Sequence, residues 1–146
     1  MDTIENTSRA SQFISAAFIL LWVYAAGSKI ASFDSYHLEM QRQVFSSNTS
    51  AVLVYIIPMT ELLAAVLLLF KKTNRMGIIF SLLLISVFTG YILLIITGYF
   101  THVPCSCGGV ISLLSWKGHL VLNMLFLTAA IIAISIKPKR EVGDKE

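Results

Sequence analysis

Four long apolar stretches, separated by short polar links, dominate the hydrophobic pattern of this chain. They cover residues 13–33, 51–70, 76–100 and 119–136. About 20 residues of helix, rising about 1.5 Å each, cross a hydrocarbon core of about 30 Å. Because lipid cannot satisfy backbone polar groups, each stretch is predicted to be a membrane-spanning helix. The short links predict an all-α, up-down-up-down four-helix bundle in a single membrane domain, followed by a tail over residues 137–146.

The composition supports a membrane protein, and in such a protein the net positive charge is interpreted differently from that of a soluble domain. Hydrophobic residues make up 56% of the 146 residues and charged residues only 13%, about half the share of a soluble domain. The formal net charge of +3 comes from basic residues at the ends of the apolar stretches, so it indicates topology and does not imply a nucleic-acid partner. The first stretch is longer than the apolar region of a signal peptide, so we expect it to be retained.

The basic residues also predict the orientation. Eight of them are expected on one side of the membrane, and only Arg42 and Lys117 on the other. Lysine and arginine are retained on the cytoplasmic side, so both termini are predicted to be cytoplasmic in the inner membrane. The eight are Arg9, Lys71, Lys72, Arg75, Lys137, Lys139, Arg140 and Lys145.

The first link, residues 34–50, lies on the predicted outer side and mixes apolar with polar residues. This pattern predicts a helix lying in the membrane interface. The "SSNTS" sequence at its end is rich in residues that cap helices, so we expect it to lead into the second spanning helix.

Cys105 and Cys107 are the only cysteines, and both lie in the "PCSCGG" sequence of the third link. This link is predicted to face the periplasm, where disulfides persist. A bond between residues two positions apart is sterically allowed but strained, and strained, exposed disulfides tend to be the labile or catalytic ones. Closing so small a ring would add little stability. We therefore favour a redox-active pair, ahead of two inert cysteines or a Cu(I) or Zn site completed by His102 or His119.

Lys29 and Glu61 are charged residues within predicted spans, where a charge is costly and marks function by default. Side chains lean toward the N-terminus of their own helix, so in antiparallel helices these two are expected to converge in the outer half of the membrane. Snorkelling to the headgroups is the alternative for Lys29. Pro58 precedes Glu61 by about one turn and is expected to open the helical hydrogen-bond ladder.

His119 and Asn123 are four residues apart, so they share one face of the fourth helix near the cysteine link. His119 is a candidate for favouring the thiolate or carrying a proton during disulfide exchange, and a helix-end or headgroup-facing role is an equal alternative. For Asn123, hydrogen bonding between helices is the simpler interpretation, with a contact to quinone as a further hypothesis.

Taken together, these motifs resemble the MauE/DoxX-like redox-associated membrane proteins. The resemblance covers about residues 13–137 and rests on Gly27-Ser28-Lys29, Pro58-x-x-Glu61, Cys105-x-Cys107-Gly108, and His119 with Asn123. It implies a role in maturing the disulfide-containing light subunit of methylamine dehydrogenase, beside a thioredoxin-like partner, with the cysteines as the redox pair. The four-helix arrangement is also similar to DsbB and the vitamin K epoxide reductases, which pass electrons to quinone. Those proteins carry Cys-x-x-Cys and a second cysteine pair, both absent here.

We therefore expect a thiol-disulfide redox protein whose Cys105 and Cys107 exchange disulfides with a periplasmic thioredoxin-like protein or client. Lys29, Glu61 and His119 would act with Asn123 as a polar cluster beneath the cysteine link, and quinone is the candidate cofactor. The first alternative is a non-enzymatic assembly or chaperone factor whose cysteines bind metal or stabilise the loop. The second is a small transporter subunit with a polar path lined by Lys29 and Glu61.

Overall fold

The structure is a computed structural model that describes residues 2–99 and 115–135. These residues form five helices, and four of them are long and apolar enough to cross a membrane. The candidate spans are Arg9–Ala31, Ser47–Leu69, Asn74–Ile96 and Trp116–Ser135. The all-helical, multi-pass membrane fold predicted from the sequence is confirmed.

The spanning helices differ from the apolar stretches mainly at their ends. They are α1 (Asp2–Ala31), α3 (Ser47–Leu69), α4 (Asn74–Ile96) and α5 (Trp116–Ser135). Helix α1 begins at Asp2, well before the apolar stretch, because the helix also includes the polar residues that precede that stretch. The apolar pattern alone does not predict this polar beginning. Helix α4 ends before residue 100, since Gly98 adopts a φ of 76° and its N–H donates to the Ile95 carbonyl.

The link between the first two spanning helices contains a short helix, α2 (Phe33–Gln41), which follows α1 after a break at Ser32. After α2 the chain turns, and the Ser46 hydroxyl accepts a hydrogen bond from the Thr49 N–H at 3.3 Å. Ser46 is therefore the N-cap of α3, as the "SSNTS" sequence predicts.

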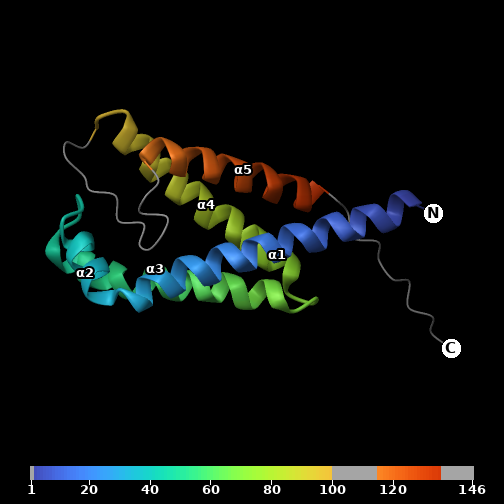
Figure 1. The fold of residues 1–146 in the computed structure, drawn as a ribbon, viewed down its shortest axis with the longest axis horizontal. Helices are drawn as coiled ribbons and strands as arrows, with labels where there is room; N and C mark the ends of the chain where they lie inside the picture. Colours follow the sequence, from blue (N-terminus) through green and yellow to red (C-terminus); the bar gives the residue numbers. More distant parts are fainter. Residues whose placement is uncertain (1, 100–114, 136–146) are drawn as a thin grey trace.

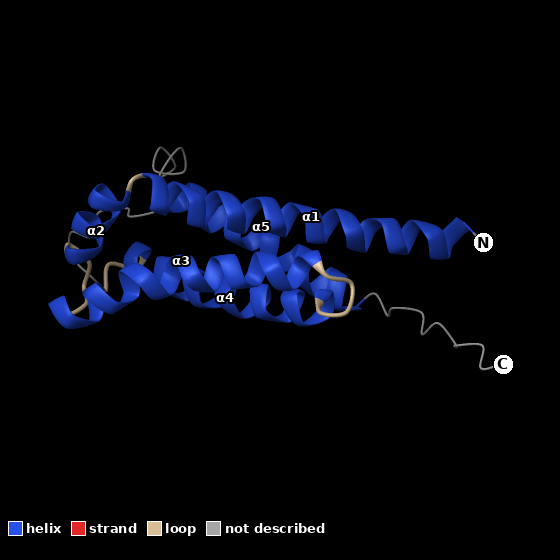
Figure 2. Cartoon of the chain, turned by 90° about the horizontal axis from the view of Figure 1, so that it is seen from below, coloured by secondary structure: helices blue, strands red, loops and turns tan. Residues whose placement is uncertain are grey.

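The long helices form two closely packed pairs, α1 with α3 and α4 with α5, and α3 also packs on α4 (Figure 1). Helix α2 lies at one end of the bundle, while the N-terminus of α1 and the end of α5 lie at the other (Figures 1 and 2). We call the first of these the α2 end.

The bundle is held together by an apolar core, into which a hydrogen bond between α1 and α4 is built. The rings of Phe18 in α1 and Phe126 in α5 meet edge to face, with centroids 5.0 Å apart. Trp22 donates its indole N–H to the Ser81 hydroxyl at 2.9 Å, which satisfies the buried polar groups of both residues.

Close backbone approach joins α3 to α4. A Cβ added at Gly77 would lie 2.9 Å from the backbone nitrogen of Leu68 and 3.0 Å from the carbonyl carbon of Leu67. Only glycine fits at this crossing. At the α2 end, Tyr36 and Met40 of α2 pack on Val54 of α3, so the short helix covers the beginning of α3.

Candidate functional site: a buried ion pair at the α2 end

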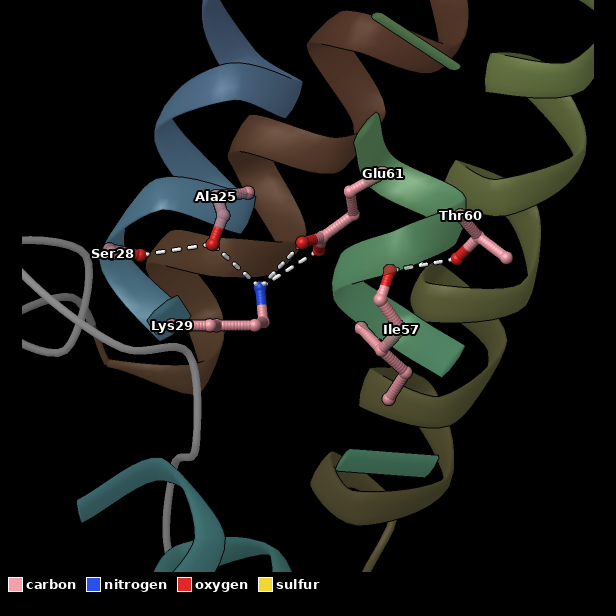
Figure 3. A network of polar contacts seen from close by, with 6 residues as sticks. All are labelled: Ala25, Ser28, Lys29, Ile57, Thr60 and Glu61. Atoms are coloured by element: carbon pink, nitrogen blue, oxygen red, sulfur yellow. Dashed lines mark hydrogen bonds and ion pairs between the residues drawn. The ribbon is translucent and has the colours of Figure 1, made fainter. Parts of the chain in front are cut away.

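Lys29 and Glu61 form an ion pair between α1 and α3. The Lys29 ammonium donates to both carboxylate oxygens of Glu61, at 2.8 Å and 3.1 Å, and to the Ala25 carbonyl at 3.1 Å (Figure 3). The side chains of Lys29 and Glu61 are 9% and 2% exposed. An ammonium group has three N–H donors, so all three are used. Lys29 therefore pairs within the bundle, and the snorkelling alternative does not describe it.

The sequence places both charges by helix geometry. Lys29 lies in the last turn of α1, where the helix dipole favours a cation. Helix α3 runs antiparallel to α1, so the side chain of Glu61 leans toward the α2 end while that of Lys29 leans away from it. The convergence predicted from the sequence is what the two side chains show (Figure 3).

Pro58 lies inside α3, about one turn before Glu61, and is buried. It has no N–H to donate to the Val54 carbonyl, four residues earlier in the helix. The neighbouring Thr60 hydroxyl donates to the Ile57 carbonyl at 2.8 Å (Figure 3). This segment of α3 therefore departs from a regular helical hydrogen-bond ladder next to the buried carboxylate.

Tyr36 of α2 lies within reach of the Glu61 charge and was not among the site residues predicted from the sequence. Its side chain is 1% exposed, and its hydroxyl has no hydrogen-bond partner in the described part of the chain. Burial raises the pKa of the Tyr36 hydroxyl, and the charge of Glu61 raises it further. The helical spacing of Tyr36 and Met40 in the sequence places both on one face of α2. That this face packs on α3 is seen only in the structure.

His119 and Asn123 both lie on α5, as predicted, but the structure does not join them to the ion pair. His119 is buried near the start of α5, and its Nε2 has no hydrogen-bond partner among the described residues. Its backbone N–H donates to the Ser115 carbonyl at 3.1 Å. Asn123 lies about one turn further along and is half-buried. Of the four members of the predicted cluster, the structure therefore pairs Lys29 with Glu61.

Cys105, Cys107 and His102 lie outside the described residues. Within residues 2–99 and 115–135, no three side chains of the histidine, cysteine, aspartate and glutamate types form a group that would hold a metal ion. The metal site suggested as an alternative depends on the cysteines, so this observation does not test it.

The arrangement constrains the chemistry at Glu61. Each carboxylate oxygen accepts one hydrogen bond from Lys29, and a carboxylate has about four acceptor positions. Glu61 therefore retains capacity to accept a further hydrogen bond while its charge is balanced. The pair is well suited to holding α1 and α3 in a fixed register and to presenting an anion within the bundle.

The chain matches a known protein family over most of its length. The family model described as "Methylamine utilisation protein MauE" matches residues 7–136. No curated protein and no solved structure shows significant similarity to the chain.

Proposed function

The chain belongs to the MauE family, and on that premise we propose that it is an inner-membrane thiol-disulfide redox protein. Cys105 and Cys107 are the proposed redox pair. The proposed partner is a thioredoxin-like or disulfide-containing protein on the outer side of the membrane. Both termini would then be cytoplasmic, consistent with the basic residues near the start of α1 and after the end of α5.

The observation that carries the proposal is where the cysteine-containing segment is anchored. Helix α4 ends at Ile96 and α5 begins at Trp116, both toward the α2 end of the bundle (Figure 1). The two helix ends that flank the cysteine-containing segment therefore lie at the end toward which the side chain of Glu61 leans. His119 is buried in the first turn of α5, directly after this segment.

The proposed reaction is disulfide exchange. A thiolate attacks one sulfur of the partner disulfide to form a mixed disulfide, and the second thiolate then releases the partner. Two thiols of one protein become a disulfide while the disulfide of the other becomes two thiols, so electrons balance. His119 is the candidate group for favouring the thiolate. In the opposite direction, a partner dithiol reduces the Cys105–Cys107 disulfide. Quinone, with Asn123 as its candidate contact, is then the proposed membrane acceptor for the two electrons and two protons that the reduced pair gives up when its disulfide re-forms.

The first test is a redox titration of the cysteine pair in native membranes. The membranes are equilibrated in thiol buffers of defined potential, and free thiols are counted by the mass added on alkylation. A reversible two-electron transition between about −120 and −270 mV, the range of disulfide exchange proteins, would support the proposal. Thiols that never form the bond, or a bridge that reductant cannot open, would overturn it.

The second test separates exchange from the alternatives. Cys105→Ser and Cys107→Ser each leave a single thiol, which would trap a mixed disulfide with the partner that reductant releases. The double variant is the matched control and would trap none. Assembly activity or transport that persists in the double variant would instead favour the chaperone or transporter alternative.

A further inference from the structure

Two buried hydroxyl groups, one on α2 and one near the beginning of α3, have no hydrogen-bond partner among the described residues. Tyr36 is 1% exposed and Ser50 is 0% exposed, and neither hydroxyl is paired within the described residues. Other buried hydroxyls are satisfied, such as Ser81 by Trp22, and Thr89 by donation to the Ile85 carbonyl. Because buried polar groups are nearly always paired, these exceptions point to a ligand.

Ser50 and the α3 residues on which Tyr36 packs lie along one strip of α3. Tyr36 packs in a cluster with Val54, against which Ile57 also packs. Ser50 is one helical turn before Val54, and Glu61 is one turn after Ile57, so all four share a side of the helix. The side chain of Glu61 leans toward the beginning of α3, and therefore toward Tyr36.

The same strip contains two groups that can accept a hydrogen bond. The Glu61 carboxylate has acceptor positions that Lys29 does not fill. The Val54 carbonyl receives no helical hydrogen bond from Pro58, which lacks an N–H. A buried water molecule makes about three hydrogen bonds to groups of this kind, and a polar site with several such partners is where water binds.

We propose that this strip binds water between α2 and α3, and that the water links the Tyr36 hydroxyl to the Glu61 carboxylate. The linked groups form a route by which Glu61 exchanges protons with the α2 end of the bundle, with Ser50 as its outermost hydroxyl. Each water that gives a proton to Glu61 takes one from the next hydroxyl, so no net chemistry occurs along the route. The effect of the Glu61 charge on the Tyr36 pKa is consistent with this coupling. The route does not depend on the cysteine chemistry.

A double-mutant cycle of Tyr36→Phe and Glu61→Gln tests the link. Thermal unfolding midpoints are measured in one detergent for the native chain, both single variants and the double variant. If the Tyr36 hydroxyl is bound through water to Glu61, Tyr36→Phe should lower the unfolding midpoint. The midpoint changes of Tyr36→Phe and Glu61→Gln should then not add up to that of the double variant. A hydroxyl buried without a ligand predicts an unchanged or raised midpoint, since phenylalanine removes an unpaired polar group. That result, or additive effects, would overturn the proposal.

Tyr55→Phe is the matched control for this cycle. Tyr55 is 60% exposed on the same helix as Glu61 and keeps its ring contact with Phe33 on substitution. Its variant should leave the midpoint unchanged in both backgrounds.

Proton exchange at Glu61 tests the route. In Lys29→Met, the carboxyl group is left without its cation in an apolar interior and takes up a proton. Exchange of that proton for deuterium in D2O shifts the infrared band of the carboxylic acid, and the band is assigned to Glu61 by its loss in Lys29→Met/Glu61→Gln. Adding Tyr36→Phe and Ser50→Ala to Lys29→Met should slow this exchange several-fold. An unchanged exchange rate would refute the route. If Lys29→Met does not fold, the cycle above, which keeps Lys29, decides on the link.

Discussion

Lys29 of α1 and Glu61 of α3 are joined by two hydrogen bonds, of 2.8 Å and 3.1 Å, at a point where both side chains are buried. The contact crosses the most extensive helix pairing in the described bundle. A buried pair of this kind gains little over two apolar residues of the same shape, but either charge alone is costly. Its value is therefore in specificity: it fixes which faces of α1 and α3 meet.

Breaking the pair should be far more damaging than deleting it. Lys29→Met or Glu61→Gln should each lower the free energy of unfolding by about 3–5 kcal/mol. Lys29→Met leaves the Glu61 carboxyl group without its cation, so that it must bind a proton, and Glu61→Gln leaves the Lys29 charge unbalanced in the bundle. The double variant Lys29→Met/Glu61→Met should recover most of the loss. Reversible unfolding in mixed micelles measures all three, with Lys71→Met, at an exposed lysine, as the control. Single variants no less stable than the double variant would contradict this explanation.

The sequence predicted the spans and this pair for the same reason. A charge in an apolar stretch has few low-energy solutions, so two opposite charges at a similar depth in antiparallel helices are expected to meet. Tyr36 could not be assigned in this way, because tyrosine is stable at an interface, in a core or beside a charge. Its position depends on how α2 folds back over α3, which is a tertiary contact with no local signature. The same applies to His119. The sequence predicts that it shares a face of α5 with Asn123, but it does not predict which residues of other helices bury it.

The crossing of α3 and α4 gives a second prediction. Gly77→Ala should lower the free energy of unfolding by about 1–3 kcal/mol, because its Cβ would meet the backbone of Leu67 and Leu68 and force the helices apart. Gly90→Ala in the same helix meets nothing within 4 Å. It should be neutral or stabilise by up to about 1 kcal/mol through helix propensity. Unfolding measured side by side in one detergent tests the pair, and equal effects would show that close approach is not what requires glycine.

Tyr36 predicts sensitivity to alkaline pH. Burial first, and the Glu61 charge second, raise the pKa of its hydroxyl above the ordinary value of 10.0. Above that pH the unfolded chain loses this proton while the folded chain keeps it. The folded state then binds more protons, so its stability is complete below pH about 10 and falls as pH rises, by about 1.4 kcal/mol per pH unit.

Tyr36→Phe should remove this part of the alkaline loss, giving a shallower fall in the free energy of unfolding over the same pH range. Tyr55→Phe, at an exposed position, should leave the slope as it is in the native chain. An alkaline slope that is the same with and without Tyr36 would show that the folded protein does not hold this proton.

The last prediction tests whether His119 serves the proposed cysteine chemistry or only the packing of α5. His119 is buried at the start of α5, with a ring nitrogen that has no partner in the described part of the chain. A histidine that favours the thiolate makes a neighbouring cysteine react faster.

His119→Gln should therefore slow alkylation of the reduced cysteine pair several-fold near neutral pH and less at alkaline pH, where thiols ionise without help. Asn123→Ala, one turn further along α5, is the control and should leave the rate unchanged. Because a purely structural histidine would alter the unfolding midpoint without changing the pH profile of alkylation, measuring both on the same variants distinguishes the two roles.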